Sequence, residues 1–450
     1  MTYDLIIKNA QTLVPKNLDL AQRSEFKIET TDIAIYKGKI AAIGSLGSAT
    51  STAQTLDATN LHVLPGIIDS QVHFREPGLT HKEDLESGTR GALLGGVTCV
   101  FEMPNTSPST TTESAFQQKL DLAKNRCHTN YAFFIGGSPD NYQNLSSLEK
   151  LPHCSGVKVF MGSSTGTLLV EDDEHLEKIL NNTKRRVIFH CEDEYRLKDR
   201  KKLFANSTDP KDHPLWRDEQ SALLATQRIV RLAQKTNHPI HVLHITTKEE
   251  MAFLKNYKSF ASVEVLPQHL TLSAPDCYER WGAFAQQNPP IRDKSHQDAL
   301  WKAIGDGIVD VFGSDHAPHT SEEKSRPYPQ TPSGMTGVQT ILPIMLDHVN
   351  TGRLSLEKLT QMMTENVRDL FKLKNKGRIQ VGMDADFTLV DIKKKMQITN
   401  KWIASKSQWT VFDGRTVTGW PVMAILNGHI CMREDEILKT HSGHGVFFEV

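Results

Sequence analysis

The order of apolar and polar positions along the chain changes near residue 64. Before that point, short apolar runs such as YDLIIKNAQTLV and DIAIYKGKIAAIG alternate with turn residues, and no long stretch has helical spacing. This pattern predicts a small antiparallel β unit over residues 1–63. The β rhythm returns in residues 373–450, which include GRIQVGMDADFTLVDI. We expect the two ends of the chain to build one β-sandwich together.

Between residues 64 and 372, short β-rich runs are each followed by a stretch with helical spacing. The strand candidates are LPGIIDSQVHF, VTCVFEMPN, YAFFIGG, GVKVFMG, RRVIFHCED, PIHVLHITT, SVEVLPQHL and IVDVFGSDHAP. Eight β-then-α units in about 260 residues are typical of a (β/α)8 barrel. We therefore predict an α/β protein in which a TIM barrel carries the terminal β-sandwich, with a doubly wound sheet as the alternative.

Several stretches between these strands have the spacing of amphipathic helices. They are KEDLESGTRGALLG, ESAFQQKLDLAKN, EQSALLATQRIVRLAQ and KEEMAFLKNY. In a capping box, the side chain of a Ser or Thr and that of a Glu three residues later bond reciprocally to the main chain at the helix start. Three pairs have this spacing and predict helix starts: Thr80 with Glu83, Thr110 with Glu113, and Thr247 with Glu250.

Charge and cysteine content narrow the class of partner. The 52 Lys and Arg residues nearly balance the 53 Asp and Glu residues, so no strong field favours nucleic acid or an anionic membrane. The six cysteines form no CxxC pair, and a chain of this length needs no disulfides, so we expect reduced thiols. We expect no leader, since no basic-plus-apolar stretch opens the sequence, and no membrane span, since no apolar run approaches roughly 18 residues. We expect a cytoplasmic protein that acts on a small molecule.

Ionisable and amide side chains gather where the predicted strands end, which is where barrel enzymes carry their chemistry. They are Gln71, His73, Arg75, Asn105, Lys158, His190, His244, His269, Asp315, His316 and His319. One histidine at a strand end is usually structural. Several imidazoles and a carboxylate that converge on one rim instead form a ligand set for a divalent cation such as Zn²⁺. Such a cation activates water and polarises a carbonyl, which indicates a hydrolase.

Lys158 has two interpretations. An ammonium group beside a dication is repelled, so an ordinary lysine would pack its stem and pair its head with a carboxylate. A desolvated lysine can instead lose its proton and add CO₂, which gives a carbamate able to bridge two metals. The residues alone favour the first interpretation.

Seven motifs in order, DSQVHFREPG, MPNTSP, GVKVFMGSSTG, IFHCED, HVLHIT, NPPIRD and GSDHAPH, resemble the amidohydrolase superfamily and its dihydroorotase branch. The resemblance covers the whole chain, and HFREPG followed by DHAPH is a specific combination. It implies reversible cyclisation of N-carbamoyl-L-aspartate to L-dihydroorotate in pyrimidine synthesis. It also implies one or two Zn²⁺ ions per chain and an N6-carboxylated Lys158.

The resemblance assigns a role to each matching residue. His190 and His244 would bind the more exposed metal, His73 and Asp315 the more buried one, and Lys158 would bridge them. Asp315 would also serve as general base. The remaining assignments concern the substrate: Arg75, Asn105 and His319 would hold its carboxylate, and Asn288 would contact its ring.

Gln71 departs from the family pattern, which has a histidine two residues before His73. A glutamine carbonyl is a weaker zinc ligand than imidazole. Three outcomes follow: two metals with one held weakly, a single metal, or a catalytically silent partner of aspartate transcarbamoylase. Because the other predicted site residues are all present, an active enzyme is favoured. Separately, we expect a homodimer.

Neutral-ring enzymes are the other alternative. VKVFMG resembles the lysine segment of hydantoinases, dihydropyrimidinases and allantoinases. Their motif after the first strand typically lacks arginine at the position of Arg75. An arginine binds a carboxylate with two hydrogen bonds, so Arg75 favours an acidic ring.

Overall fold

The computed structural model describes residues 2–47, 50–163, 168–438 and 440–449. Its central sheet has eight parallel strands in sequential order: β6 (Ile67–Val72), β7 (Val97–Glu102), β8 (Asn130–Gly136), β9 (Cys154–Phe160), β10 (Val187–His190), β11 (Ile240–Val242), β12 (Ala261–Val265) and β13 (Val311–Phe312). A parallel bridge between Val72 and His316 joins the first strand to the chain after the last. The sheet closes into a barrel, and all eight predicted strands are present.

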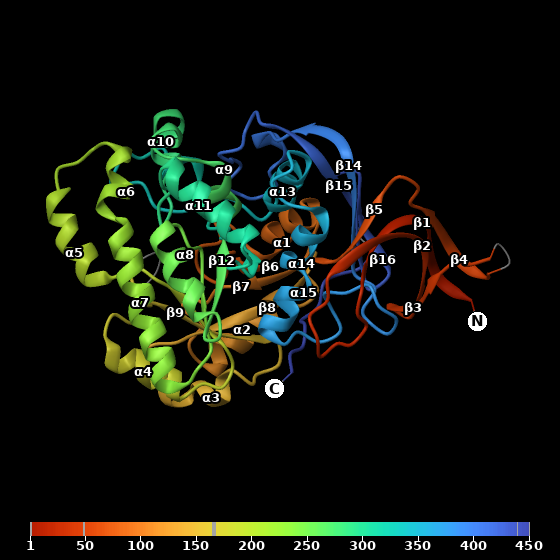
Figure 1. Cartoon of the computed structure of the whole chain (residues 1–450), viewed down its shortest axis with the longest axis horizontal. Coiled ribbons are helices and arrows are strands. Elements are labelled where there is room, and N and C mark those ends of the chain that lie inside the picture. The colour runs from red at the N-terminus through yellow and green to blue at the C-terminus, as the bar shows by residue number, and fades with distance from the viewer. Residues whose placement is uncertain (1, 48–49, 164–167, 439, 450) are drawn as a thin grey trace.

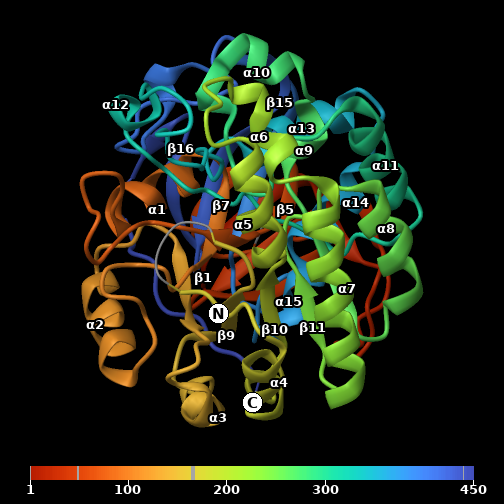
Figure 2. The same cartoon turned by 90° about the vertical axis from the view of Figure 1, so that its left-hand side faces the viewer.

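Helices surround this barrel (Figures 1 and 2). The longer ones are α1 (Leu85–Leu94), α2 (Glu113–Ala123), α4 (Asp173–Asn181), α5 (Glu194–Leu203), α7 (Glu219–Thr236), α8 (Lys248–Leu254), α11 (Lys294–Gly305), α13 (Ile341–Asn350), α14 (Leu356–Met363) and α15 (Glu365–Phe371). The short ones are α3 (Leu145–Leu148), α6 (His213–Trp216), α9 (Pro267–Thr271), α10 (Asp276–Trp281) and α12 (Ser321–Lys324). Within the described ranges, no helix combines the length and the apolar character needed to cross a bilayer.

Helix starts test the three predicted capping boxes. The helix start at Thr247 is confirmed, because its side chain caps α8 and accepts a hydrogen bond from the Glu250 amide at 3.1 Å; the Glu250 carboxylate accepts from the Thr247 hydroxyl at 2.9 Å, so the pair is not the reciprocal main-chain box. The other two predictions are wrong: α2 begins after Thr112, and α1 begins after Asp84, which forms a capping box with Ser87. Each segment offers several Ser, Thr or Asp side chains near the helix start, so spacing alone does not select the cap.

Both ends of the chain join in one nine-stranded sheet, as predicted. The N-terminal part supplies β1 (Tyr3–Pro15), β2 (Phe26–Tyr36), β3 (Lys39–Gly44), β4 (Thr52–Asp57) and β5 (His62–Pro65). The C-terminal part supplies β14 (Phe387–Gln397), β15 (Thr416–Leu426), β16 (His429–Arg433) and β17 (Glu436–Ile437). Antiparallel pairing of β5 with β14 connects the two sets, which lie together in Figure 1. Apolar residues from both sets share one core, including Ile7, Ile35, Phe387 and Ile425.

A buried ion pair fastens the connection between β1 and β2 to the barrel. The Arg378 guanidinium donates from Nε to the Glu365 carboxylate at 3.0 Å and from Nη1 to the Asp19 carbonyl at 3.0 Å. Glu365 also accepts a hydrogen bond from the Ser24 amide at 2.7 Å. Neither charged side chain is exposed. The pair therefore joins α15 to a loop more than three hundred residues away in sequence.

Replacement of Arg378 by alanine is expected to lower the free energy of unfolding by up to about 3–5 kcal/mol, because the buried Glu365 carboxylate loses the cation that donates hydrogen bonds to it and, among the described residues, keeps only the cation of Arg368, at 3.5 Å. Urea denaturation measures the change. Arg433→Ala removes an exposed arginine from β16 of the terminal sheet and should change stability by less than about 0.5 kcal/mol. Equal effects from the two variants would contradict this account of the ion pair.

Candidate active site

The barrel brings most of the predicted site residues to the carboxyl ends of its strands. Gln71 lies in β6, Lys158 in β9 and His190 at the end of β10. The others follow a strand directly: His73 comes after β6, Asn105 after β7, His244 after β11 and Asp315 after β13. Strand β9 pairs with β10 so that Phe160 lies opposite His190, which places Lys158 two residues deeper. The periodicity that identified the strands also located this rim.

Four of these side chains form one contact group. The His73 Nδ1 atom lies 2.7 Å from the Asn105 amide oxygen, which can only accept, so Nδ1 carries the proton. The other ring nitrogen, Nε2, then presents a lone pair 3.1 Å from the Asp315 Oδ1 atom. Gln71 donates to the same oxygen at 3.0 Å. Two acceptors that face each other at this distance fit a proton or a metal ion between them.

The protonation state of this group also suits metal binding. Burial lowers the pKa of His73, which favours the neutral imidazole. Burial alone would raise the pKa of Asp315, but a proton on His73 Nε2 would offset burial through its hydrogen bond and charge, so the pKa of Asp315 lies well below its ordinary range and the carboxylate is ionised. A neutral imidazole and an ionised carboxylate are the forms that bind cations.

A second pair forms on the neighbouring strands. The His190 Nε2 atom lies 2.9 Å from the Glu192 carboxylate and must donate to it, so Nδ1 is an acceptor. That Nδ1 atom lies 3.0 Å from His244 Nε2. Arg217 donates to Glu192 at 3.0 Å, and its charge offsets the effect of burial and lowers the pKa of that carboxylate. Burial lowers the pKa of both histidines, so each is neutral and can act as a ligand.

Lys158 lies at the same rim, and no carboxylate of the described residues is in hydrogen-bonding range of it. Its side chain is buried, and its Nζ atom has no hydrogen-bond partner among the residues that the structure describes. Burial lowers the pKa of Lys158 to about 7, so much of it is the neutral amine near neutral pH. Only a neutral amine adds CO₂. The environment therefore suits carboxylation better than an ordinary ion pair.

A metal would have to draw on the His73–Asp315 pair, the His190–His244 pair and Lys158. In the described part of the chain, no three His, Cys, Asp or Glu side chains already lie together in a metal-binding group. However, Gln71 Oε1, Lys158 Nζ and His244 Nδ1 are buried without a hydrogen-bond partner in that same part. Buried polar atoms rarely stay unpaired. These residues fit a divalent cation if carboxylated Lys158 supplies the ligand that each pair lacks.

A cationic cluster lies beside this rim. The buried Arg75 donates from Nε to the Pro318 carbonyl at 3.3 Å, whereas its Nη1 atom has no partner within the described ranges. Burial lowers the pKa of Arg75 to about 10, which leaves it charged at neutral pH. His319 donates to the Ser333 carbonyl at 3.0 Å and accepts from Lys82 at 3.2 Å. Lys82 is itself paired with Glu323 at 3.0 Å, so the group suited to bind a further carboxylate is the unsatisfied guanidinium N–H of Arg75.

The structure does not bring Asn288 into hydrogen-bond contact with these groups among the described residues. Its side-chain oxygen instead accepts a hydrogen bond from His213 at 3.0 Å. His269 differs from the prediction, because it lies in α9 rather than at the end of β12. Its Nε2 atom lies 2.6 Å from the Gln287 amide nitrogen and 3.2 Å from the Pro289 carbonyl oxygen, so it supports the loop that carries Asn288. The end of the GVKVFMGSSTG motif, residues 164–166, lies outside the described residues.

Several buried charged residues at the site were missed by the sequence analysis. Glu192 follows His190 by two residues, and side chains two apart in a strand share a face, so its position was a usable signal. Glu264 interrupts the apolar strand β12, and a charged residue in such a strand was a second usable signal. Lys82 and Arg217 gave no such signal, since only folding brings them to the rim.

Comparison with known proteins places the chain in a family. The model of the Amidohydrolase family matches residues 62–431. A dihydroorotase of Methanothermobacter thermautotrophicus is 31% identical over 91% of this chain and 93% of its own. A dihydroorotase of Pyrococcus abyssi is 34% identical over 86% of this chain and 87% of its own.

Solved structures of similar proteins bear other names. The L-hydantoinase (dihydropyrimidinase) of Arthrobacter aurescens has a TM-score of 0.92 and 28% identity over 99% of this chain and 100% of its own. The dihydropyrimidinase of Brevibacillus agri has a TM-score of 0.89 and 26% identity over 98% and 97% of the two chains. The barrel and the terminal sheet agree with these matches. This chain therefore belongs to the amidohydrolase family.

Proposed function

We propose that this protein is a dihydroorotase, which interconverts L-dihydroorotate and N-carbamoyl-L-aspartate in pyrimidine biosynthesis. The observation that carries the proposal is the buried, charged Arg75, whose Nη1 atom lacks a partner among the described residues. Dihydroorotate bears a carboxylate that such a group would bind, whereas dihydrouracil and hydantoin do not. The relatives named dihydroorotase match the chain over most of its length and support the same substrate.

The metal in this proposal is Zn²⁺, one or two ions per chain. His73, His190, His244, Asp315, the Gln71 carbonyl oxygen and N6-carboxylated Lys158 would hold it. When bound, zinc lowers the pKa of water and polarises the ring carbonyl. The two amide side chains beside His73 and Asp315 differ in role: the Asn105 oxygen fixes the His73 tautomer, whereas Gln71 donates to Asp315 and keeps an oxygen that has no partner within the described ranges.

Asp315 moves the proton in ring opening. As water attacks the ring carbonyl carbon, Asp315 accepts a proton from that water and passes it to the ring nitrogen as the C–N bond breaks. The products are the new carboxylate and the ureido group of N-carbamoyl-L-aspartate. Arg75, Asn105 and His319 hold the carboxylate already present in the substrate. Because its oxygen accepts from His213, Asn288 would present its amide N–H groups to the ring.

A neutral-ring hydrolase is the second candidate, favoured by the names of the similar solved structures. Turnover assays with purified, zinc-supplemented protein separate the two, using L-dihydroorotate, N-carbamoyl-L-aspartate, dihydrouracil, hydantoin and allantoin. Activity confined to the acidic pair is the expected result. Activity confined to the neutral rings would overturn the proposal. A folded protein that turns over none of them would instead be a silent partner of aspartate transcarbamoylase.

Replacement of Gln71 by histidine is expected to raise the zinc retained after dialysis by up to one ion per chain. Imidazole binds zinc more tightly than an amide carbonyl does, and the new ring would lie beside His73 and Asp315. Elemental analysis of the dialysed protein measures the change. Gln71→Leu, which removes both the carbonyl and the hydrogen bond to Asp315, should retain less zinc than the wild type. Equal zinc content in all three proteins would show that residue 71 does not contact a metal.

A further inference from the structure

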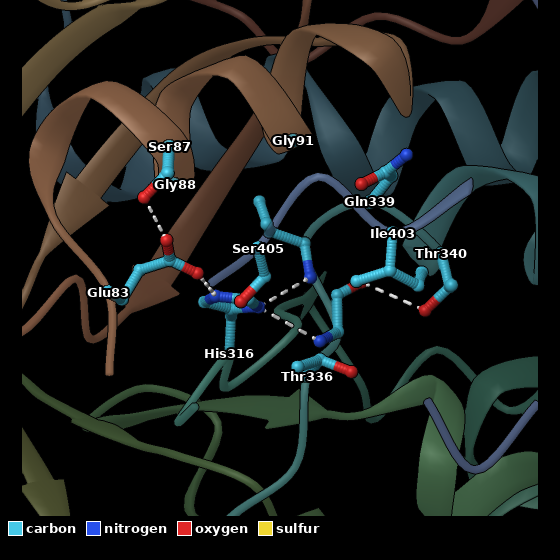
Figure 3. Close-up of a pocket in the computed structure, with 12 residues that line it drawn as sticks. Glu83, Ser87, Gly88, Gly91, His316, Thr336, Gln339, Thr340, Ile403 and Ser405 are labelled. Atoms are coloured by element: carbon cyan, nitrogen blue, oxygen red, sulfur yellow. Dashed lines mark hydrogen bonds and ion pairs between the residues drawn. The ribbon is translucent and has the colours of Figure 1, made fainter. Parts of the chain in front are cut away.

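The histidine next to Asp315 points away from the rim. His316 faces a small cavity beside α1, with a volume of about 10 Å³, which is room for about one water molecule. Figure 3 shows the His316 ring opposite the carboxylate of Glu83, with Ser87 of α1 behind that carboxylate. Glu83 is completely buried and His316 nearly so. A buried carboxylate that contacts a buried imidazole is costly unless both are fully bonded.

The bond directions around this pair are fixed by the main chain. The His316 Nδ1 atom accepts hydrogen bonds from the amides of Gly337 at 3.1 Å and Val338 at 3.4 Å. Since an amide N–H can only donate, the ring proton of neutral His316 is on Nε2, 3.3 Å from Glu83 Oε2. The other Glu83 oxygen accepts from the Ser87 hydroxyl and, at 3.4 Å, from the Lys406 amide.

The main chain of His316 connects this pair to the proposed catalytic group. Its carbonyl accepts from the His73 amide at 2.8 Å, and its amide donates to the Ser314 hydroxyl at 3.1 Å. Between them, Asp315 has a φ of 44°, in the left-handed region that non-glycine residues seldom occupy. A residue in this conformation persists only where its surroundings hold it. The His316 side chain is one such anchor on the C-terminal side of Asp315.

We propose that Glu83 and His316 are positioning residues that hold the Asp315 carboxylate against His73. Glu83 keeps the His316 ring in one tautomer and one orientation, and the ring fixes the main chain on which Asp315 is mounted. This inference rests on the proposed dihydroorotase function. The spacing of Glu83 from Thr80 predicted a capping box, but its side chain instead contacts His316 in the loop after β13.

Three variants test the proposal in the full-length protein. Glu83→Ala removes the acceptor for His316, and Glu83→Gln restores a neutral acceptor of the same length. Glu86→Ala is the control, because Glu86 lies in the first turn of α1, three residues from Glu83, and its partly exposed carboxylate contacts a different histidine, His128, at 3.0 Å. The measurements are kcat and KM for L-dihydroorotate, thermal unfolding, and the zinc affinity of metal-free protein in competition with a chelator.

We expect Glu83→Ala to lower kcat and zinc affinity by about 10–100-fold, the usual effect of losing a group that supports a metal ligand, with KM within threefold. Glu83→Gln should recover both to within threefold of the wild type, and Glu86→Ala should leave both unchanged. Equal kcat and zinc affinity in Glu83→Ala and the wild type would overturn the proposal, and so would equal losses in Glu86→Ala.

Two further outcomes separate this inference from the function on which it rests. If Glu83→Ala does not fold, Glu83→Asp is used, which shortens the side chain by one methylene; wild-type kcat and zinc affinity in that variant would overturn the positioning role. If the wild type neither binds zinc nor turns over dihydroorotate, the proposed function fails, and this inference fails with it. Loss of kcat and zinc affinity in the Glu83 variants alone would leave the proposed function intact.

Discussion

Replacement of Asp315 by asparagine is expected to lower kcat for ring opening of L-dihydroorotate by about 10³-fold, within the range for loss of a general base. Asparagine has nearly the same shape, and its oxygen can still accept the hydrogen bond that Gln71 donates at 3.0 Å. It cannot take a proton from water near neutral pH. Steady-state rates measure the loss, and KM should change by less than about threefold because Asp315 is not proposed to bind the substrate carboxylate.

The control for this variant lies at the other end of the same strand. Asp310 comes just before β13 and pairs with Lys258, so Asp310→Asn removes a carboxylate remote from the proposed ligands. It should keep a kcat close to that of the wild type. Zinc content is measured in both variants, because Asp315 is also a proposed ligand. An Asp315→Asn protein that keeps more than a tenth of the wild-type kcat would show that another group takes the proton.

The strands of the barrel could be predicted because parallel strands covered on both faces are continuous apolar runs. The run LPQHL shows where this signal fails. It continues the apolar pattern of β12 past Val265, yet Pro267 begins the short helix α9, and His269 lies in that helix. A proline lacks the amide that a central strand needs, so Pro267 was the sign that the strand had ended.

The residues of the site also fall into those that could be predicted from the sequence and those that could not. His73, Lys158 and His190 could be predicted because a strand end fixes the position of a side chain relative to the barrel rim. The role of Glu83 could not be predicted, since its contact with His316 spans 233 residues and depends on how the start of α1 packs against the loop after β13. The same holds for Lys82, which contacts His319 across 237 residues. Sequence spacing describes one element at a time, whereas these contacts join two.

Replacement of Arg75 by methionine is expected to lower kcat/KM for L-dihydroorotate by about 10²–10³-fold, or roughly 3–4 kcal/mol, because it removes one partner of a buried charge pair with the substrate. Any slow turnover of dihydrouracil should not fall, since that ring has no carboxylate. Arg75→Lys keeps a positive charge but loses the two-pronged geometry, so it should lie between the wild type and methionine.

These two variants are well matched. Arg75 has a φ of 63°, and every non-glycine residue there bears a similar main-chain cost, so the comparison isolates the head group. Burial lowers the pKa of Arg75 only to about 10, so the wild-type residue is a cation at neutral pH, and methionine removes a full charge. Comparison of kcat/KM for the acidic and neutral rings in all three proteins measures the effect. If methionine lowered both by the same factor, Arg75 would serve the structure of the rim, and the choice of an acidic substrate would have to rest on the neighbouring His319 and Lys82.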